Sequence, residues 1–202
     1  MANEARVRIG HCSPDAPNVD VHVDGDPAFE NVAFGDLSDY AELAAGEHHV
    51  RVVPAGGGDA VIDANVDLDE GTGYTVLATG MLADIEPSVF TDEPGEVASD
   101  KSHVRFIHAS PDAPAVSIGV KDGPEVFTDV GFRMASDYQA VDDGSYDLDV
   151  HPAGSDDVVL SVRGLSFDGG SAYTAIAIGQ VGDDTLDVIL AEDAMRAVPA
   201  DD

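Results

Sequence analysis

A seven-residue segment occurs twice in the chain, as His11–Pro17 and as His108–Pro114, with six of the seven positions identical. The two copies lie 97 residues apart (108 − 11). Further matches follow at offsets of 98 and 99, namely Ser38–Tyr40 with Ser136–Tyr138, Pro54–Gly56 with Pro152–Gly154, and Tyr74–Thr75 with Tyr173–Thr174. Internal repetition at a near-constant spacing indicates architecture before any secondary structure is assigned. The chain is therefore predicted to contain two copies of one unit.

The matches place the first unit at residues 5–92 and the second at 102–195, with a short polar linker at 93–101. An acidic C-terminal tail is expected at 196–202. A unit of this length buries roughly 60–70% of the surface that its unfolded chain exposes. Each unit is thus expected to enclose its own apolar core.

Within each unit, apolar and polar residues alternate over short runs. Residues 19–24 alternate in this way and residues 116–120 repeat the apolar set, which is typical of a half-buried strand. Similar runs lie at 5–11, 47–53, 60–68, 73–80 and 85–91, and near 102–108, 145–151, 158–167, 172–179 and 185–191. Only Leu37–Leu43 could form a short helical turn. Glycine, proline and aspartate separate the runs at hairpin spacing, so we predict an all-β fold of two tandem immunoglobulin-like, seven-stranded, antiparallel Greek-key sandwiches.

A tyrosine near one turn supports this fold class. Tyr74 follows Gly71 by three residues at the start of a strand-like run. Immunoglobulin-like sandwiches place a tyrosine at such a corner, where its hydroxyl bonds back to the backbone. We expect the same bond here.

The charge of the chain restricts its partners. Forty acidic residues stand against nine basic ones, a formal charge of −31, while 44% of the residues are hydrophobic. Such a chain folds but repels phosphates, so nucleic acid and anionic lipid are excluded as partners. Lysine is represented only by Lys101 and Lys121. A carboxylate surface this dense suits concentrated salt, where the Debye length is about 3 Å, and we expect a halophile; an ordinary acidic protein is the alternative.

The cysteine content and the hydropathy of the chain exclude several features and identify none. Cys12 is the single cysteine, so the chain forms no intramolecular disulfide and no cysteine-based zinc cluster. No apolar stretch is long enough to span a membrane, and residues 1–8 lack the apolar segment of a signal peptide. On these grounds alone a soluble, cytoplasmic protein is possible.

The repeated His-x-Ser-Pro-Asp-Ala-Pro segment is followed by the strand Val19–Gly25, the Ser-Asp-Tyr triplet and the Pro-Ala-Gly turn. Together these resemble the domain of unknown function 4397 (DUF4397) family, of the halophilic-archaeal type, in two copies covering nearly the whole chain. The resemblance implies a small β-sandwich that is often exported or attached to a microbial surface, and it favours an extracellular or cell-surface location. It implies no established activity.

The repeated segment supplies the first candidate site. Its chemistry-bearing residues are His11, Ser13 and Asp15 in the first unit and His108, Ser110 and Asp112 in the second. Each histidine shares the parity of buried strand residues and should point inward. One interpretation is a rigid loop that closes the sandwich; the alternative is a ligand or metal site at the loop tip. A Ser-His-Asp triad is excluded because alternating residues of one short loop cannot form its chain of contacts.

A second candidate lies on one strand of the first unit. Asp20, His22 and Asp24 would project from one face, and carboxylates with an imidazole suit a divalent cation. The second unit has no such set at these positions, so any metal site belongs to the first unit alone. A solvated acidic strand face is the alternative.

Tyr40 and Tyr138 follow Ser-Asp at equivalent positions. Exposed rings could form a sugar-binding platform, whereas buried rings would pack in the core with their hydroxyls satisfied.

We therefore expect a non-catalytic structural or interaction module rather than an enzyme. Its partners would be proteins, or further copies of the chain, bound through strand edges and loops. No cofactor is expected. The alternative is a protein that binds a divalent cation or small ligand at the His-x-Ser-Pro-Asp loops or at the Asp20, His22 and Asp24 face.

Overall fold

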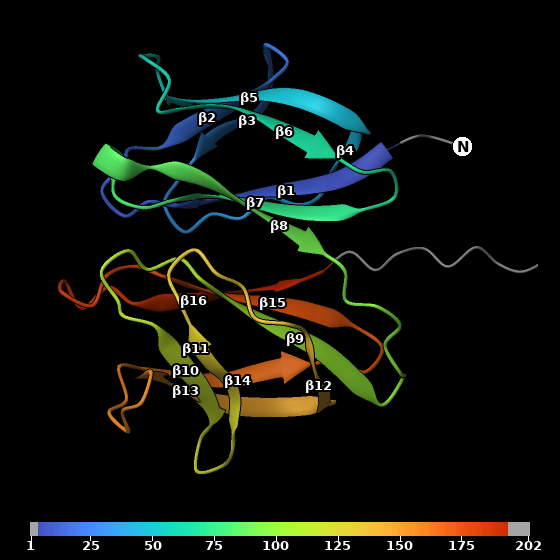
Figure 1. The fold of residues 1–202 in the computed structure, drawn as a ribbon, viewed down its shortest axis with the longest axis vertical. Helices are drawn as coiled ribbons and strands as arrows, with labels where there is room; N and C mark the ends of the chain where they lie inside the picture. The colour runs from blue at the N-terminus through green and yellow to red at the C-terminus, as the bar shows by residue number, and fades with distance from the viewer. Residues whose placement is uncertain (1–3, 194–202) are drawn as a thin grey trace, which may run out of the picture.

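A computed structural model describes residues 4–193 as sixteen β-strands and one short 3-10 helix (Figure 1). The first unit contains β1 (Glu4–Cys12), β2 (Val19–Val23), β3 (Asp26–Val32), β4 (Ala41–Ala44), β5 (Gly46–Pro54), β6 (Ile62–Leu68), β7 (Gly73–Thr79), the helix η1 (Leu82–Asp84) and β8 (Glu86–Asp92). The second contains β9 (Lys101–His108), β10 (Val116–Val120), β11 (Glu125–Val130), β12 (Gln139–Asp142), β13 (Gly144–Pro152), β14 (Leu160–Phe167), β15 (Ala172–Ile178) and β16 (Asp187–Glu192). No described helix is long and apolar enough to cross a membrane.

The strands form four sheets of four strands each. The first unit has the sheets β4-β1-β7-β8 and β3-β2-β5-β6, and the second has β12-β9-β15-β16 and β11-β10-β13-β14. We call the sheets containing β1 and β9 the inner sheets and the other two the outer sheets. Figure 1 shows the four layers stacked, with the two inner sheets facing each other in the middle. The predicted all-β fold class, with two immunoglobulin-like sandwiches, is confirmed.

Three details differ from the sequence prediction. Each unit has eight strands rather than seven. The pairs β1–β7 and β9–β15 are parallel, although the other pairs are antiparallel. They can be parallel because β7 enters the inner sheet from β6 of the outer sheet, so no hairpin fixes its direction against β1. Leu37–Leu43 is extended rather than helical, because Leu37 bridges to Gly10 and β4 begins at Ala41.

Each unit encloses its own aliphatic core. The core of the first unit includes Val7, Val21 and Val52, and that of the second includes Phe106, Ile118 and Val150. A third apolar cluster, which was not predicted from the sequence, lies between the two inner sheets. Its buried members are Cys12, Leu77, Ile107, Ala109, Ile176 and Ile178.

This third cluster explains why two strands do not alternate. Every residue of β15 is buried, and β7 is buried at all but one position. One face of each strand packs into its own sandwich, while the other packs against the opposite unit. Strands buried on both faces are typically runs of small and apolar residues, as Ala172–Ile178 is.

The expected tyrosine corner is present in both units. The hydroxyl of Tyr74 accepts a hydrogen bond from the Asp69 amide at 3.0 Å, and that of Tyr173 accepts one from the Asp168 amide at 3.1 Å. The expected tail at 196–202, and the end of the second unit at 194–195, lie outside the described residues.

Candidate functional site

The His-x-Ser-Pro-Asp loop of the first unit begins at the end of β1, where His11 is completely buried. Its Nε2 lies 2.9 Å from the Pro17 carbonyl, and its Nδ1 accepts a hydrogen bond from the Ser13 amide at 3.3 Å. Because a carbonyl can only accept, the ring is the neutral tautomer with its proton on Nε2. Burial lowers the pKa of His11, although the bond to Pro17 acts in the opposite direction.

The second unit repeats this arrangement. Nε2 of His108 lies 2.9 Å from the Pro114 carbonyl, and the Ser110 amide donates to its Nδ1 at 3.2 Å. Burial again lowers the pKa of the ring. In both loops the two ring nitrogens are occupied by backbone groups, so neither histidine is placed to activate a serine.

The loop aspartates bind a neighbouring connection. Asp15 accepts from the Leu82 amide at 2.7 Å, and Asp112 accepts from the amides of Val181 and Gly182 at 2.8 and 2.9 Å. At Asp112, burial favours the neutral form but the two amide bonds outweigh it, so the pKa of the carboxyl is lowered. These bonds tie each loop to the connection between the last two strands of its unit.

The two loop serines differ. The hydroxyl of Ser110 lies 3.4 Å from Asp112, whereas that of Ser13 is buried with no hydrogen-bond partner among the described residues. Cys12 lies beside Ser13, and complete burial raises the pKa of its thiol to about 12. That thiol is thus unsuited to act as a nucleophile at neutral pH.

Asp20, His22 and Asp24 do not share one strand face. β2 ends at Val23, and Asp24 lies in the following turn with φ of +54°. Asp20 accepts from the Asn31 amide at 2.7 Å. Among residues 4–193, no group of three or more His, Cys, Asp or Glu side chains is placed to hold a metal ion.

The Asp24 carboxylate instead connects the turn after β2 to the beginning of β5. Its carboxylate accepts from the His49 amide at 2.9 Å and contacts Nδ1 of His48 at 2.6 Å. These two bonds lower the pKa of Asp24. The pKa of His48 is raised by its contact with the Ala44 carbonyl and by Asp24.

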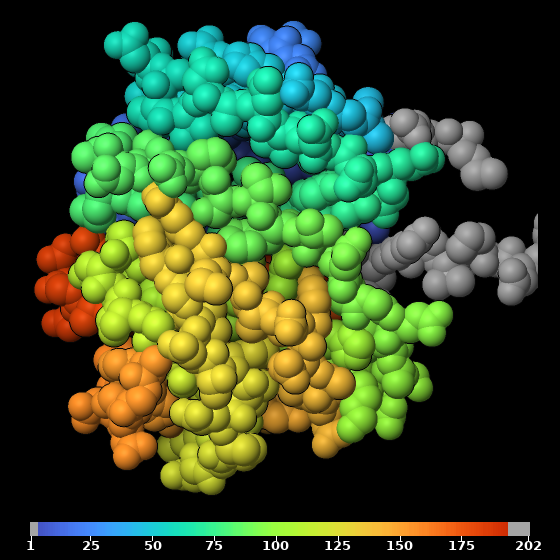
Figure 2. Space-filling model, viewed as in Figure 1, coloured from blue at the N-terminus to red at the C-terminus, as the bar shows by residue number. Residues whose placement is uncertain are grey.

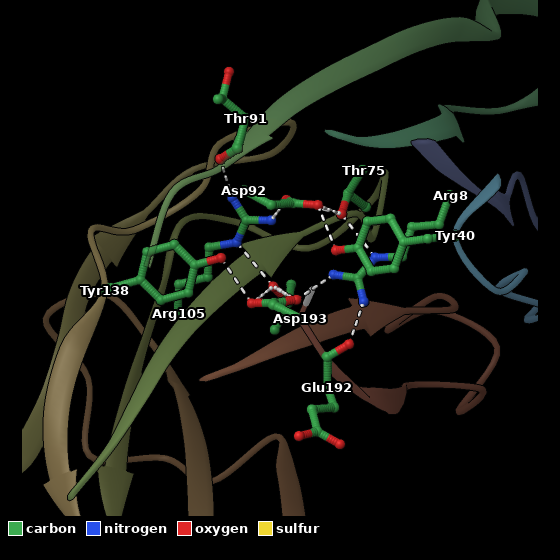
Figure 3. Close-up of polar contacts among 10 residues, drawn as sticks. Arg8, Tyr40, Thr75, Thr91, Asp92, Arg105, Tyr138, Glu192 and Asp193 are labelled. Atoms are coloured by element: carbon green, nitrogen blue, oxygen red, sulfur yellow. Dashed lines mark hydrogen bonds and ion pairs between the residues drawn. The ribbon is translucent and has the colours of Figure 1, made fainter. Parts of the chain in front are cut away.

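Tyr40 and Tyr138 lead to a polar network between the two units (Figure 3). The hydroxyl of Tyr40 donates to Asp92 at 2.6 Å, and that of Tyr138 donates to Asp193 at 2.7 Å. Burial, joined at Tyr40 by the nearby Asp92 charge, raises the pKa of both phenols above their usual value. The hydroxyls therefore stay protonated and act as donors. This agrees with the prediction that they are satisfied internally, but at the interface between the units.

Arg8 of β1 crosses from the first unit to the second. Its Nη2 forms an ion pair with Asp193, and its Nη1 donates to the Glu192 carbonyl at 3.1 Å. Its Nε donates to Thr75 of its own unit at 2.8 Å. The guanidinium also lies over the Tyr40 ring, 4.8 Å from its centroid.

Arg105 of β9 makes the same set of contacts in the opposite direction. Its Nη2 forms an ion pair with Asp92, its Nη1 donates to the Thr91 carbonyl at 2.8 Å, and its Nε donates to Thr174 at 2.9 Å. Its guanidinium lies 5.0 Å from the Tyr138 ring centroid. Figure 3 shows the two guanidiniums and the two carboxylates converging between the inner sheets.

The two aspartates are held by their own units as well. Thr75 donates to Asp92, with oxygen–oxygen distances of 2.9 and 3.0 Å, and Thr174 donates to Asp193 at 2.8 Å. The side chains of both ion pairs are 3% exposed or less. The cluster thus contains two buried cations and two buried anions whose charges balance.

Sequence reasoning missed these arginines and aspartates. Arg8 alternates with the core residues Val7 and Ile9 along β1, so it points away from the core of its own sandwich. One signal was available, because arginine occupies the same place in both repeats of a chain with only nine basic residues. No such signal identified the aspartates that pair with these arginines, because the sequence contains 40 acidic residues spread along its length.

One contact between the units has no counterpart. Arg133 donates to Glu86 at 2.7 Å, to Thr79 at 3.0 and 3.1 Å, and to the Asp84 carbonyl at 2.7 Å. The equivalent position in the first unit, 98 residues earlier, is Gly35. Figure 2 shows the yellow loop before β12 lying against the green β7–β8 region of the first unit. Arg133 therefore makes the interface directional.

An open groove of about 580 Å³ borders the network between the two units. It is lined by Val89, Phe90 and Thr91 of β8, Glu93 and Pro94 of the linker, His103 and Arg105 of β9, and Ala135–Tyr138. Arg105 and Tyr138 are already bound in the network, so the exposed charges of the groove are those of Glu93 and Asp137. The groove exists only while the units are docked.

Removing one arginine of the network should be costly. In an Arg105→Met variant, Asp92 stays buried without its cation, and we expect the free energy of unfolding to fall by about 3–5 kcal/mol. The matched control is Arg163→Met, because Arg163 pairs with Asp149 on an outer sheet with its side chain 40% exposed. That change should cost about 1 kcal/mol or less. Equal losses in denaturant titrations of the two variants would contradict the role given to Arg105.

The loop histidines predict a dependence on pH. Because their folded pKa values lie below the ordinary 6.5, the unfolded chain takes up protons first as the pH falls. The contribution of these two histidines to the free energy of unfolding should therefore be constant above about pH 6.5 and should decrease below it. Denaturant titrations between pH 8 and 5 would measure this, and a His11→Gln, His108→Gln double variant should lose that part of the decrease.

His48 provides the opposite control. Its pKa is raised, so it adds stability at low pH that is lost as the pH rises through its folded pKa. A His48→Gln variant should lose the gain in stability that the unaltered chain shows as the pH falls from the raised pKa of His48 to about 6.5, and its slope below that pH should be unchanged. An unchanged pH profile in the double variant would refute the loop assignment.

Two solved structures are distantly similar to the chain. A family 26 carbohydrate-binding module of Eubacterium rectale Amy13K, solved with maltoheptaose, is 8% identical with a TM-score of 0.30, over 95% of this chain and 98% of that one. A putative cell adhesion protein of Bacteroides fragilis is 9% identical with a TM-score of 0.24, over 96% and 100%. No curated protein matches the chain.

A protein-family model does match. The model described as "Domain of unknown function (DUF4397)" matches residues 5–119 and 120–202. The boundary between the two matches falls inside β10, whereas the chain passes from one sandwich to the other between β8 and β9. With nearly the whole chain covered, this protein belongs to the DUF4397 family and carries the domain in two tandem copies.

Proposed function

We propose that this protein is a non-catalytic structural and interaction module of a halophile, associated with a cell surface or an assembly. The observation that carries the proposal is that the buried charged and imidazole side chains are engaged in contacts within the protein. The buried histidines, arginines and aspartates bind the backbone of their own loops or lock the two sandwiches together. They are placed to hold a rigid body rather than to turn over a substrate.

The rigid body would present loops and strand edges to a protein partner. β8 and β16 are each an edge strand of an inner sheet, as are β4 and β12 on the opposite edges, and the groove beside β8 is formed by both units. Exposed strand edges and domain junctions are common places for protein contacts. The acidic charges of Glu93 and Asp137 would favour a neutral or positively charged segment of the partner.

The distribution of charge supports work in concentrated salt. Among the described residues, Asp92 and Asp193 are the only buried carboxylates, and both are paired with arginine. The remaining described acids are at least partly exposed, where they repel one another in dilute buffer. Salt screens exposed charges far more than buried pairs. Concentrated salt would therefore relieve the repulsion while leaving the two buried pairs intact.

The salt dependence of folding tests this environment. We expect the far-ultraviolet circular dichroism of native strands at about 1 M KCl to disappear cooperatively as the salt falls toward about 0.01 M, where the Debye length reaches about 30 Å. NaCl should give a similar midpoint if screening is the cause. Full native structure in dilute buffer would overturn the halophilic part of the proposal.

Calorimetry tests the part of the proposal that assigns no metal ion to the protein. We expect no binding heat when calcium, zinc or manganese is titrated into the folded chain, because the candidate carboxylates and the two loop histidines already hold backbone groups. A saturable heat would favour the metal-binding alternative. Its loss in His22→Ala would then place the site on the first outer sheet, and its loss in His11→Ala would place it at the loop.

A further inference from the structure

The interface between the units is built from the same groups on both sides. Arg8 of the first unit binds Asp193 of the second, and Arg105 of the second binds Asp92 of the first. Arg8 and Arg105 are equivalent repeat positions, and each aspartate lies at the end of the last strand of its unit, Asp92 as the final residue of β8 and Asp193 directly after β16. Each unit therefore gives an arginine and receives one. This is the pattern of an isologous interface between two copies of one subunit.

The backbone acceptors follow the same symmetry. Arg8 binds the carbonyl of Glu192, which pairs with Tyr173 across the ladder, and Arg105 binds that of Thr91, which pairs with Tyr74. The apolar layer is related in the same way, with Leu77 facing the interface in one unit and Ile176 in the other. Nothing in these contacts requires the two units to belong to one chain.

The linker is the only covalent connection between the units, and it is short. It spans residues 93–100 and turns back on itself before β9, with the backbone amide of Lys101 donating to the Ala98 carbonyl at 3.0 Å. Figure 1 shows the chain leaving β8 and reversing through this segment into β9. The linker thus decides which second unit docks on a given first unit.

We propose that the inner sheet of each unit is a docking face for a second copy of this chain. Two chains exchange their second units and close into a dimer, in which the Arg8–Asp193 and Arg105–Asp92 pairs form between chains. The closed dimer contains the same two interfaces as two separate monomers. Linker geometry and protein concentration therefore decide between the two forms.

The exchange is directional because of Arg133. Its bonds to Thr79, Asp84 and Glu86 require a first unit opposite a second unit. A pair of first units would place Gly35 at both of these positions and would lose the contacts. The proposed dimer is therefore a reciprocal exchange rather than a pairing of like units. The contacts that define this partner are independent of the function proposed above.

Deleting residues 93–100 tests the exchange. The deletion joins Asp92 to Lys101, with about 3.8 Å between their Cα atoms. Arg105 lies four residues further on, roughly 13 Å along a strand, and the chain would have no residues in which to reverse. Pairing within the chain is then impossible. We expect light scattering to give twice the monomer mass, with native circular dichroism, in concentrated salt.

Two matched variants define the interface. Replacing residues 93–100 by eight glycine and serine residues should leave a monomer, because the chain can still reverse. Adding Arg105→Met to the deletion should weaken dimerisation by about 100-fold or more, since Asp92 then stays unpaired. A folded deletion variant that is monomeric, or whose dimer ignores Arg105→Met, would overturn the proposal.

The unaltered chain gives a second measurement in case the deletion variant does not fold. Unlabelled and nitrogen-15-labelled chains are unfolded together and refolded in concentrated salt at low and at high protein concentration. Native mass spectrometry should detect dimers of mixed mass whose share rises with concentration. Monomers alone at every concentration would overturn the proposal.

Discussion

The rest of the structure depends on two buried ion pairs across the interface between the units. Arg8 of the first unit pairs with Asp193, and Arg105 of the second unit pairs with Asp92. These pairs place two cations and two anions in a layer that excludes water, where an unpaired charge is costly. Within each unit a threonine and a tyrosine hold the aspartate in place, so both ion pairs can form only when the two inner sheets are placed with each arginine opposite the other unit's aspartate. Apolar packing alone would tolerate sliding. The ion pairs therefore fix the register of the two sandwiches, and the groove between them follows from that register.

Neutral and anionic side chains hold the two His-x-Ser-Pro-Asp loops. In a chain with so few cations, neutral His11 and His108 hold the loop backbone, and aspartates accept from backbone amides at the neighbouring connection. Arg8, Arg105 and Arg133 are three of only nine basic residues, and all three lie at the interface between the units. The charges of Arg8 and Arg105 lie where salt cannot easily screen them, whereas most of the described acidic charge lies where salt can.

Sequence reasoning succeeded where one residue pattern has one structural solution. The repeat of His11–Pro17, the alternation over residues 19–23 and the corner at Tyr74 each predicted what the structure contains. It failed where several solutions exist. Parity marks Arg8 as outward-facing, but outward can mean solvent or another sheet. Asp24 continues an alternating pattern in sequence, yet the hairpin turn at Asp24–Gly25 takes its carboxylate away from the strand face.

The amino-acid sequence by itself determined two β-sandwiches, each with its own aliphatic core, because periodicity and turn residues act over short distances. It also determined the acidity of the chain, which is a matter of composition. Only the tertiary structure decided that the sandwiches dock through their inner sheets, and which two of forty acidic residues are buried there. That choice depends on groups as far apart as Arg8 and Asp193, which are separated by 185 residues in the sequence, meeting at one point. No local pattern records such a meeting.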